Sequence, residues 1–127
     1  MRFGCGYIRQ LVTSENAATW VAEQDGRMAG FAIVEWAEDA GGITAYIQTI
    51  EVAAEKRSRG VGSELLRHAE ASARAAGAGV VWLHVDAENT DAIRLYEAHG
   101  YAREGREENY YPRRRPALIY AKTLKAA

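Results

Sequence analysis

The 127-residue sequence predicts one mixed α/β domain of the α+β type, with elements in the order β-β-β-α-β-α-β-β. Three observations predict this fold. The Asp25-Gly26 pair joins two strand-like runs, which is typical of a tight β-hairpin. The spacing of apolar residues changes from a strand period to a helix period at Gly60. A short apolar run at 80–86 then precedes a second helical pattern. This alternation of strand and helix favours a mixed sheet with helices packed against it.

Three strands are expected before the first helix. Residues 17–24 and 27–36 form the predicted hairpin, and a polar loop at 38–42 follows it. Residues 43–52 are rich in β-branched side chains and form the third strand. Residues 1–16 show a weaker pattern that indicates one or two amphipathic turns. The apolar residues of this pattern are Tyr7, Ile8, Leu11 and Val12.

The second half alternates helices with strands. The first helix is expected from Gly60 to a stop at Gly77, and residues 80–86 form a central strand with apolar side chains on both faces. Asn89 can cap a second helix that ends at Gly100. The last antiparallel pair, 101–109 and 117–124, surrounds a loop at 110–116. The apolar positions of the first helix are Val61, Leu65, Leu66, Ala69, Ala73 and Ala76.

The composition indicates a soluble single domain over residues 1–127 and does not by itself specify a function. The chain is 48% hydrophobic with a formal net charge of −1, which argues against a general nucleic-acid binder. Its one cysteine, Cys5, builds neither a disulfide framework nor a zinc site. The apolar stretches are shorter than the roughly 20 residues of a membrane span, and the start lacks a secretory signal. We therefore expect a cytoplasmic protein with no membrane partner.

The segment between the third strand and the first helix carries a first motif, R-x-x-G-x-G, at Arg57 to Gly62. Glycines let the backbone approach a ligand, and the N–H groups at a helix N-terminus form a ready site for phosphates. Arg57 and Arg59 add charge-assisted hydrogen bonds. The segment is neither a Walker loop nor a dinucleotide G-x-G-x-x-G fingerprint. A plain glycine-rich turn is the alternative interpretation.

A second motif, N-x-x-A-x-x-L-Y-x-x-x-G-Y, runs from Asn89 to Tyr101. With the first motif and the element order, residues 17–124 resemble the GNAT superfamily of acyl-CoA-dependent N-acetyltransferases. The resemblance implies an enzyme with the GNAT fold that uses acetyl-CoA as acyl donor and no metal. It also implies that residues 1–16 are a reduced N-terminal segment, because the family's usual first strand and first helix are missing or much shortened.

The resemblance assigns cofactor-binding roles. Ile50, Glu51 and Val52 would offer main-chain hydrogen bonds to the pantetheine arm, and their N–H groups would receive the oxyanion. Asn89 would bind the cofactor from the neighbouring segment. Tyr96 would lie near the thioester sulfur and protonate the departing thiolate, with a core aromatic as the alternative. The loop residues that would hold the pyrophosphate are Arg57, Ser58, Arg59, Gly60, Val61, Gly62 and Ser63.

Three segments, 46–50 (YIQTI), 82–86 (WLHVD) and 109–112 (NYYP), are similar to the ribosomal-protein alanine N-acetyltransferases and their N-alpha-acetyltransferase relatives. The bacterial ribosomal-protein enzymes carry glutamate at the position of His84. The relatives that act on Met-starting N-termini carry histidine there and tyrosine at the position of Tyr46, and this pair holds a water that acts as base. The resemblance therefore implies a protein or peptide N-terminus as acceptor, such as that of a ribosomal protein.

The chemistry of the acceptor agrees with a mild base. An α-amino group has a pKa of about 7.7–8.0, well below that of a lysine side chain, and a histidine acting through water suffices to deprotonate it. His84 with Tyr46 is the expected base, and a histidine merely packed at a strand end is the alternative. Glu51 is a rival base, but strict strand alternation puts it on the face opposite Tyr46 unless a bulge intervenes.

Two further segments have open interpretations. Tyr110 and Tyr111 would clamp the peptide backbone, or else pack across strands at a hairpin tip. Arg113-Arg114-Arg115 is most simply a solvated loop, and a functional role would favour acidic residues beyond the N-terminus or ribosomal RNA.

The reduced N-terminal segment leaves alternatives for the acceptor. That region normally supplies one wall of the acceptor site, and apolar surface left by a missing helix favours a homodimer. A small-molecule amine N-acetyltransferase and a catalytically silent acyl-CoA-binding module remain as other functions.

Overall fold

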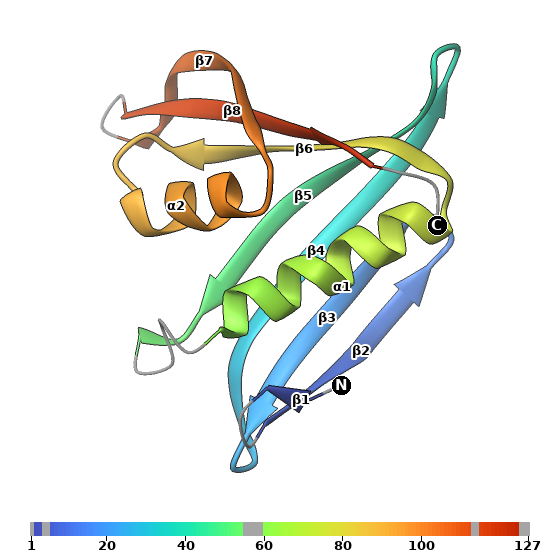
Figure 1. Ribbon diagram of the computed structural model, residues 1–127, viewed down its shortest axis with the longest axis vertical. Coiled ribbons are helices and arrows are strands. Elements are labelled where there is room, and N and C mark those ends of the chain that lie inside the picture. The colour runs from blue at the N-terminus through green and yellow to red at the C-terminus, as the bar shows by residue number, and fades with distance from the viewer. Residues whose placement is uncertain (1, 4–5, 55–59, 113–114, 125–127) are drawn as a thin grey trace.

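A computed structural model describes residues 2–3, 6–54, 60–112 and 115–124, which form one sheet and two helices (Figure 1). The sheet order is β1-β2-β3-β4-β5-β6-β8-β7, and among its described pairs only β5 and β6 are parallel. The predicted mixed fold is confirmed, with two additional N-terminal strands. The elements are β1 (Arg2–Phe3), β2 (Gly6–Ser14), β3 (Ala17–Gln24), β4 (Arg27–Asp39), β5 (Gly42–Val52), α1 (Val61–Ala75), β6 (Ala78–Asp86), α2 (Thr90–Ala98), β7 (Ala102–Tyr111) and β8 (Arg115–Thr123).

The hairpin predicted at Asp25-Gly26 is confirmed between β3 and β4. Asp25 and Gly26 both have positive φ, 53° and 72°. Two central residues with positive φ form a turn whose twist matches that of the flanking strands.

The N-terminal segment forms a strand, so the amphipathic turns expected around Tyr7, Ile8, Leu11 and Val12 are wrong. β2 pairs antiparallel with β3 along its length. Ile8 is buried, whereas Tyr7 and Leu11 are about half exposed. Pairing satisfies the backbone groups along the edge of β3, and this tertiary gain outweighs a weak helical pattern.

Helix α1 lies across β3, β4 and β5 (Figure 1) and presents the apolar face that the sequence predicts. Burial of such a face is the main source of stability for a helix of this length. Neither helix in the described part of the chain is long and apolar enough to span a membrane. The buried residues of α1 are Val61, Leu65, Leu66, Ala69, Glu70 and Ala73.

Strands β5 and β6 separate part-way along their length. Their parallel pairing ends at Ile47↔Leu83. Beyond this point β5 continues on β4 as far as Gly30↔Val52, and β6 continues on β8 as far as Asp86↔Ala117. Helix α2 lies in the wedge between the diverging strands (Figure 1). One edge of β5 therefore has no partner strand from Gln48 to Glu51 within the described sheet.

The last hairpin forms as predicted, but its connection is shorter than expected. β7 extends to Tyr111 and β8 begins at Arg115, so Tyr110 and Tyr111 belong to a strand rather than to the predicted loop. Cross-strand pairing of Tyr111 with Arg115 extends the ladder to the hairpin end. Arg113 and Arg114 lie outside the described residues.

Candidate active site

A β-bulge in β5 changes which side chains face the gap between β5 and β6. The pairing with β4 skips Gln48, which is therefore an extra residue in β5. Ile47 before the bulge packs into the core beneath α1, and so do Ile50 and Val52 after it. A bulge of this kind shifts the alternation of side chains by one position.

Glu51 consequently lies on the same face as Tyr46, and the expectation that alternation turns it to the opposite face is wrong. Thr49 Oγ1, on this face, donates to Glu51 Oε2 at 2.6 Å. Gln48 Nε2 donates to Glu35 Oε2 at 2.8 Å, and Glu35 is the cross-strand partner of Tyr46. Glu35 thus lies beside Tyr46 on the face away from α1, and Glu51 lies on the same face further along β5.

Tyr46 and His84 contact each other directly across the point where β5 and β6 separate. Tyr46 Oη and His84 Nδ1 are 2.8 Å apart. A water bound by this pair would therefore lie beside it rather than between these two atoms. Burial raises the pKa of the Tyr46 phenol, and the neighbouring Tyr110 raises it further, so the phenol keeps its proton at neutral pH.

Glu107 of β7, which the sequence does not single out, is hydrogen-bonded to the other nitrogen of the His84 ring. His84 Nε2 and Glu107 Oε2 are 2.8 Å apart. The sheet order places β7 two strands from β6, and this order is not readable from residue spacing. The exposed run of glutamates in β7 would otherwise indicate only a solvated strand face.

Tyr110 covers one face of the His84 ring. The two rings stack with centroids 4.3 Å apart and planes inclined by 13°. Asn109 has a positive φ of 57°, and the β7–β8 register shifts between Glu107 and Tyr111. This irregularity in β7 re-aims Tyr110, as bulges commonly do beside functional sites. Tyr111 packs edge-on against Tyr110 at 4.9 Å.

Tyr96 lies in the core beside the gap and is 5% exposed. Burial raises the pKa of its phenol, with further contributions from Glu51 on β5 and Tyr111 on β7. No hydrogen bond to the hydroxyl is found within the described ranges. Among the described residues the hydroxyl is therefore a protonated donor without an acceptor.

The start of α1 is described from Gly60 onward. Gly60 is the N-cap with φ of 81°, a left-handed conformation that favours glycine. A Cβ on Gly62 would lie 3.2 Å from Leu95 of α2, so this glycine lets the two helices approach each other. Val61 is buried, and Ser63 Oγ lies 3.0 Å from His99 Nε2. Arg57, Ser58 and Arg59 lie outside the described residues.

Asn89 begins α2, and its side chain serves the helix. Its carboxamide oxygen accepts a hydrogen bond from the Ala92 backbone N–H at 3.1 Å. This is the N-cap that the sequence predicts.

Arg115 is held by the fold rather than simply solvated. Its Nε donates to Asp86 Oδ2 at 2.6 Å, at the end of β6. A hydrogen bond from the Glu88 backbone N–H, supported by Arg115, lowers the pKa of the Asp86 carboxyl. This ion pair fastens the end of β6 to the start of β8.

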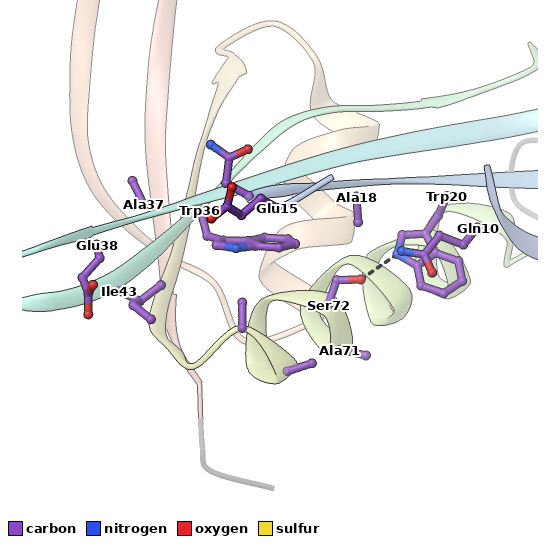
Figure 2. A pocket seen from close by; sticks show the side chains of 13 residues that line it. Gln10, Glu15, Ala18, Trp20, Trp36, Ala37, Glu38, Ile43, Ala71 and Ser72 are labelled. Atoms are coloured by element: carbon purple, nitrogen blue, oxygen red, sulfur yellow. Dashed lines mark hydrogen bonds between the residues drawn. The ribbon is translucent and has the colours of Figure 1, made fainter. Parts of the chain in front are cut away.

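An open groove of about 920 Å³ lies away from these residues, between the C-terminal half of α1 and strands β3 and β4 (Figure 2). Trp20 and Trp36 line it, and Trp20 Nε1 donates to Ser72 Oγ at 2.8 Å. None of the predicted site residues lines this groove. Among the described residues there is also no group of three His, Cys, Asp or Glu side chains that could hold a metal ion.

Comparison with known proteins identifies related sequences. Residues 4–101 match the acetyltransferase (GNAT) family. Streptothricin acetyltransferase of Streptomyces lavendulae is 41% identical over 87 residues, which cover 68% of this chain and 45% of that protein. The [ribosomal protein bS18]-alanine N-acetyltransferase of Escherichia coli (strain K12) is 36% identical over 101 residues, covering 77% of this chain and 66% of that protein. The match thus spans about half of the first relative and about two thirds of the second.

A solved structure agrees with the described fold. The ribosomal-protein-S18-alanine N-acetyltransferase from Escherichia coli superposes with a TM-score of 0.82 at 26% identity, covering 96% of each chain.

Proposed function

Because the chain belongs to the acetyltransferase (GNAT) family, we propose that it transfers an acetyl group from acetyl-CoA to the α-amino group of a protein or peptide N-terminus. The observation that carries this proposal is the hydrogen-bonded Tyr46–His84 pair at the point where β5 and β6 separate. Similarity to the bS18-alanine N-acetyltransferase supports the same acceptor class.

The described residues fit acetyl-CoA. Within the described sheet the edge of β5 from Gln48 to Glu51 has no partner strand, and its backbone would pair with the amides of a pantetheine arm. The N-terminus of α1 begins at Gly60, and exposed N–H groups at such a terminus favour phosphates. Acetyl-CoA supplies the activated acyl group, and the chain supplies orientation and the groups that move protons.

Tyr46 and His84 would remove the proton from the incoming amine. The α-amino group has a pKa of about 7.7–8.0 and is largely protonated at neutral pH. Since the Tyr46 phenol stays protonated, it acts as a relay rather than as a phenolate base. Its oxygen accepts the amine proton, directly or through one water, as its own proton passes to His84 Nδ1.

Tyr96 would serve as the general acid. Its buried phenol retains a proton at neutral pH, and the departing thiolate needs one. Tyr110 and Tyr111 would line the path of the peptide backbone, since Tyr110 is 43% exposed and lies over the base. A ribosomal protein as acceptor, a homodimer and a cytoplasmic location remain predictions.

A small cationic amine is a second candidate acceptor. The similarity to streptothricin acetyltransferase favours it. Glu35 lies beside Tyr46, Glu107 beside His84, and Glu51 further along the same face of β5, and the three carboxylates would attract any cationic acceptor. This charge pattern suits both candidates, so the acceptor must be settled by activity.

The experiment is release of CoA thiol from acetyl-CoA with a panel of acceptors. The panel holds peptides starting with Met, Ala, Ser or Thr, an N-blocked lysine peptide, spermidine, streptothricin and an aminoglycoside. We expect turnover with free peptide N-termini only. Turnover confined to small amines would replace the proposed acceptor with the second candidate. Acetyl-CoA binding without thiol release on any amine would indicate a silent binding module.

A further inference from the structure

We propose that Glu107 is a positioning residue that orients the His84 ring and keeps Nδ1 as the atom that receives the proton. The inference rests on the proposed function of the Tyr46–His84 pair. It comes from the second hydrogen bond of the same ring, 2.8 Å from Nε2 to Glu107 Oε2.

The two partners of the ring determine which nitrogen carries the proton. A carboxylate only accepts hydrogen bonds, so the nitrogen facing Glu107 must carry a hydrogen. In the neutral ring, Nδ1 is then the lone-pair nitrogen and accepts the hydrogen of the Tyr46 phenol. Glu107 thereby aims the basic nitrogen at Tyr46 rather than away from it.

The surroundings hold the ring in this orientation. Tyr110 stacks on one face of the ring, and Trp82 packs edge-on at 5.2 Å. The His84 side chain is only 11% exposed, whereas that of Glu107 is 51% exposed. Packing therefore fixes the ring plane, and the Glu107 bond selects which edge faces Tyr46.

Glu107 would also stabilise the charge that arises during transfer. As the amine proton reaches the Tyr46 oxygen, the phenol hydrogen moves to Nδ1 and the ring becomes a cation. Nε2 keeps its hydrogen, and the Glu107 carboxylate lies beside the new charge. An oriented carboxylate acts in this way on the histidine of a catalytic triad without taking the proton itself.

The test compares Glu107→Ala and Glu107→Gln with the matched control Glu108→Gln. Glu108 is the neighbouring exposed glutamate and pairs with Arg106. Each protein is labelled with ¹⁵N-histidine, and the ring N–H resonances are recorded. The chain has three histidines, so a His84→Asn variant assigns the signal. Steady-state kinetics follow on whichever acceptor the wild type uses.

We expect a downfield His84 Nε2–H resonance in the wild type and in Glu108→Gln. Glu107→Ala should lose this resonance and lower kcat by about tenfold, with KM for acetyl-CoA unchanged. Glu107→Gln retains an accepting oxygen without the charge. This variant should keep the resonance, and its kcat should lie between those of the wild type and Glu107→Ala.

Absence of the resonance in the wild type would overturn the positioning role, whatever the acceptor. Loss of the resonance in Glu107→Ala with unchanged kcat would overturn it as well. Acetylation of small amines alone would overturn the proposed function, while the Glu107 variants would still test positioning on that reaction.

Discussion

One buried phenol, one half-buried phenol and one imidazole carry the proposed proton movements, and each has a distinct environment. Tyr46 is hydrogen-bonded to His84, whereas no partner of the Tyr96 hydroxyl is found among the described residues. Burial raises the pKa of both phenols, so both remain protonated at neutral pH. The hydrogen bond to His84 therefore suits Tyr46 to relay a proton, whereas Tyr96 is suited to donate one.

Tyr96→Phe should therefore slow turnover by about tenfold or more with little change in acetyl-CoA affinity, because only the hydroxyl is lost from a packed ring. Measurement of kcat and of acetyl-CoA binding by calorimetry checks this. Because the pKa of Tyr96 is raised above its ordinary value near 10, kcat should show no alkaline loss from this acid below about pH 10. Normal turnover in the variant would remove Tyr96 from the mechanism.

His84→Ala should depress activity most at low pH. Near pH 6.5 most α-amines carry a proton that the base must remove, whereas near pH 9 most are already free. We expect the wild-type-to-variant rate ratio to be at least about tenfold larger at pH 6.5 than at pH 9. His68→Ala, on α1 against Trp20, is the control for loss of an imidazole elsewhere. A pH-independent ratio would contradict a role as base.

For single residues, the sequence predicts which residues form the site better than it predicts the face of the sheet on which each one lies. Tyr46, His84 and Tyr110, all singled out from the sequence, lie together in the structure. The face of Glu51 was predicted wrongly because one inserted residue, Gln48, shifts the alternation. The role of Glu107 is not predicted from the sequence, because its contact with His84 depends on the order of the strands in the sheet.

Among the elements, the edge of β5 depends on close contact with β4 at Gly30. A Cβ at Gly30 would lie 2.5 Å from the Glu51 carbonyl oxygen, which is backbone and cannot turn aside. A larger residue must therefore push the end of β5 away from β4. The displaced segment is the one proposed to bind pantetheine.

Gly30→Ala should lower the free energy of unfolding by about 1–3 kcal/mol and weaken acetyl-CoA binding several-fold. Gly79→Ala is the matched control, because Gly79 also lies in a strand and its added Cβ would meet nothing within 4 Å. Denaturant titration and calorimetry measure the two effects. Equal behaviour of the two variants would show that the close approach is unimportant.

Most helices and strands are predicted from residues close in the sequence. The remaining strands form because a neighbouring strand of the sheet pairs with them. The hairpin at Asp25-Gly26, the face of α1 and the cap of α2 at Asn89 depend on nearby residues and are confirmed. The strand β2 depends on the exposed edge of β3, which no local pattern reveals. Tyr110 and Tyr111 likewise belong to a strand because β8 extends to meet them.

For the molecule as a whole, a buried charge links three parts of the chain. Glu70 of α1 is 4% exposed. Its carboxylate accepts from Tyr101 Oη at 2.8 Å and from Lys122 Nζ at 3.0 and 3.2 Å. The cluster joins α1 to the segment before β7 and to β8. Burial and the nearby Glu70 raise the pKa of the Tyr101 phenol, so that hydroxyl remains a donor.

Glu70→Ala should lower the free energy of unfolding by about 2–4 kcal/mol, because it leaves a buried hydroxyl and an amine without their acceptor. Glu108→Ala is the control, since Glu108 pairs with Arg106 and both side chains are largely exposed. It should cost about 0.5 kcal/mol. Urea unfolding followed by circular dichroism compares them, and similar losses would contradict a structural role for the cluster.

A crystal structure of this chain with a CoA–acetyl–peptide bisubstrate analogue tests the proposed function most directly. We expect the CoA part to lie along the edge of β5 that has no partner strand within the described sheet, and the peptide to lie on the face of the sheet away from α1, over Tyr46 and Tyr110. The linking nitrogen should then lie about 3 Å from Tyr46 Oη, or one water away from it. A linking nitrogen well beyond the reach of one water from both Tyr46 and His84 would contradict the proposed site.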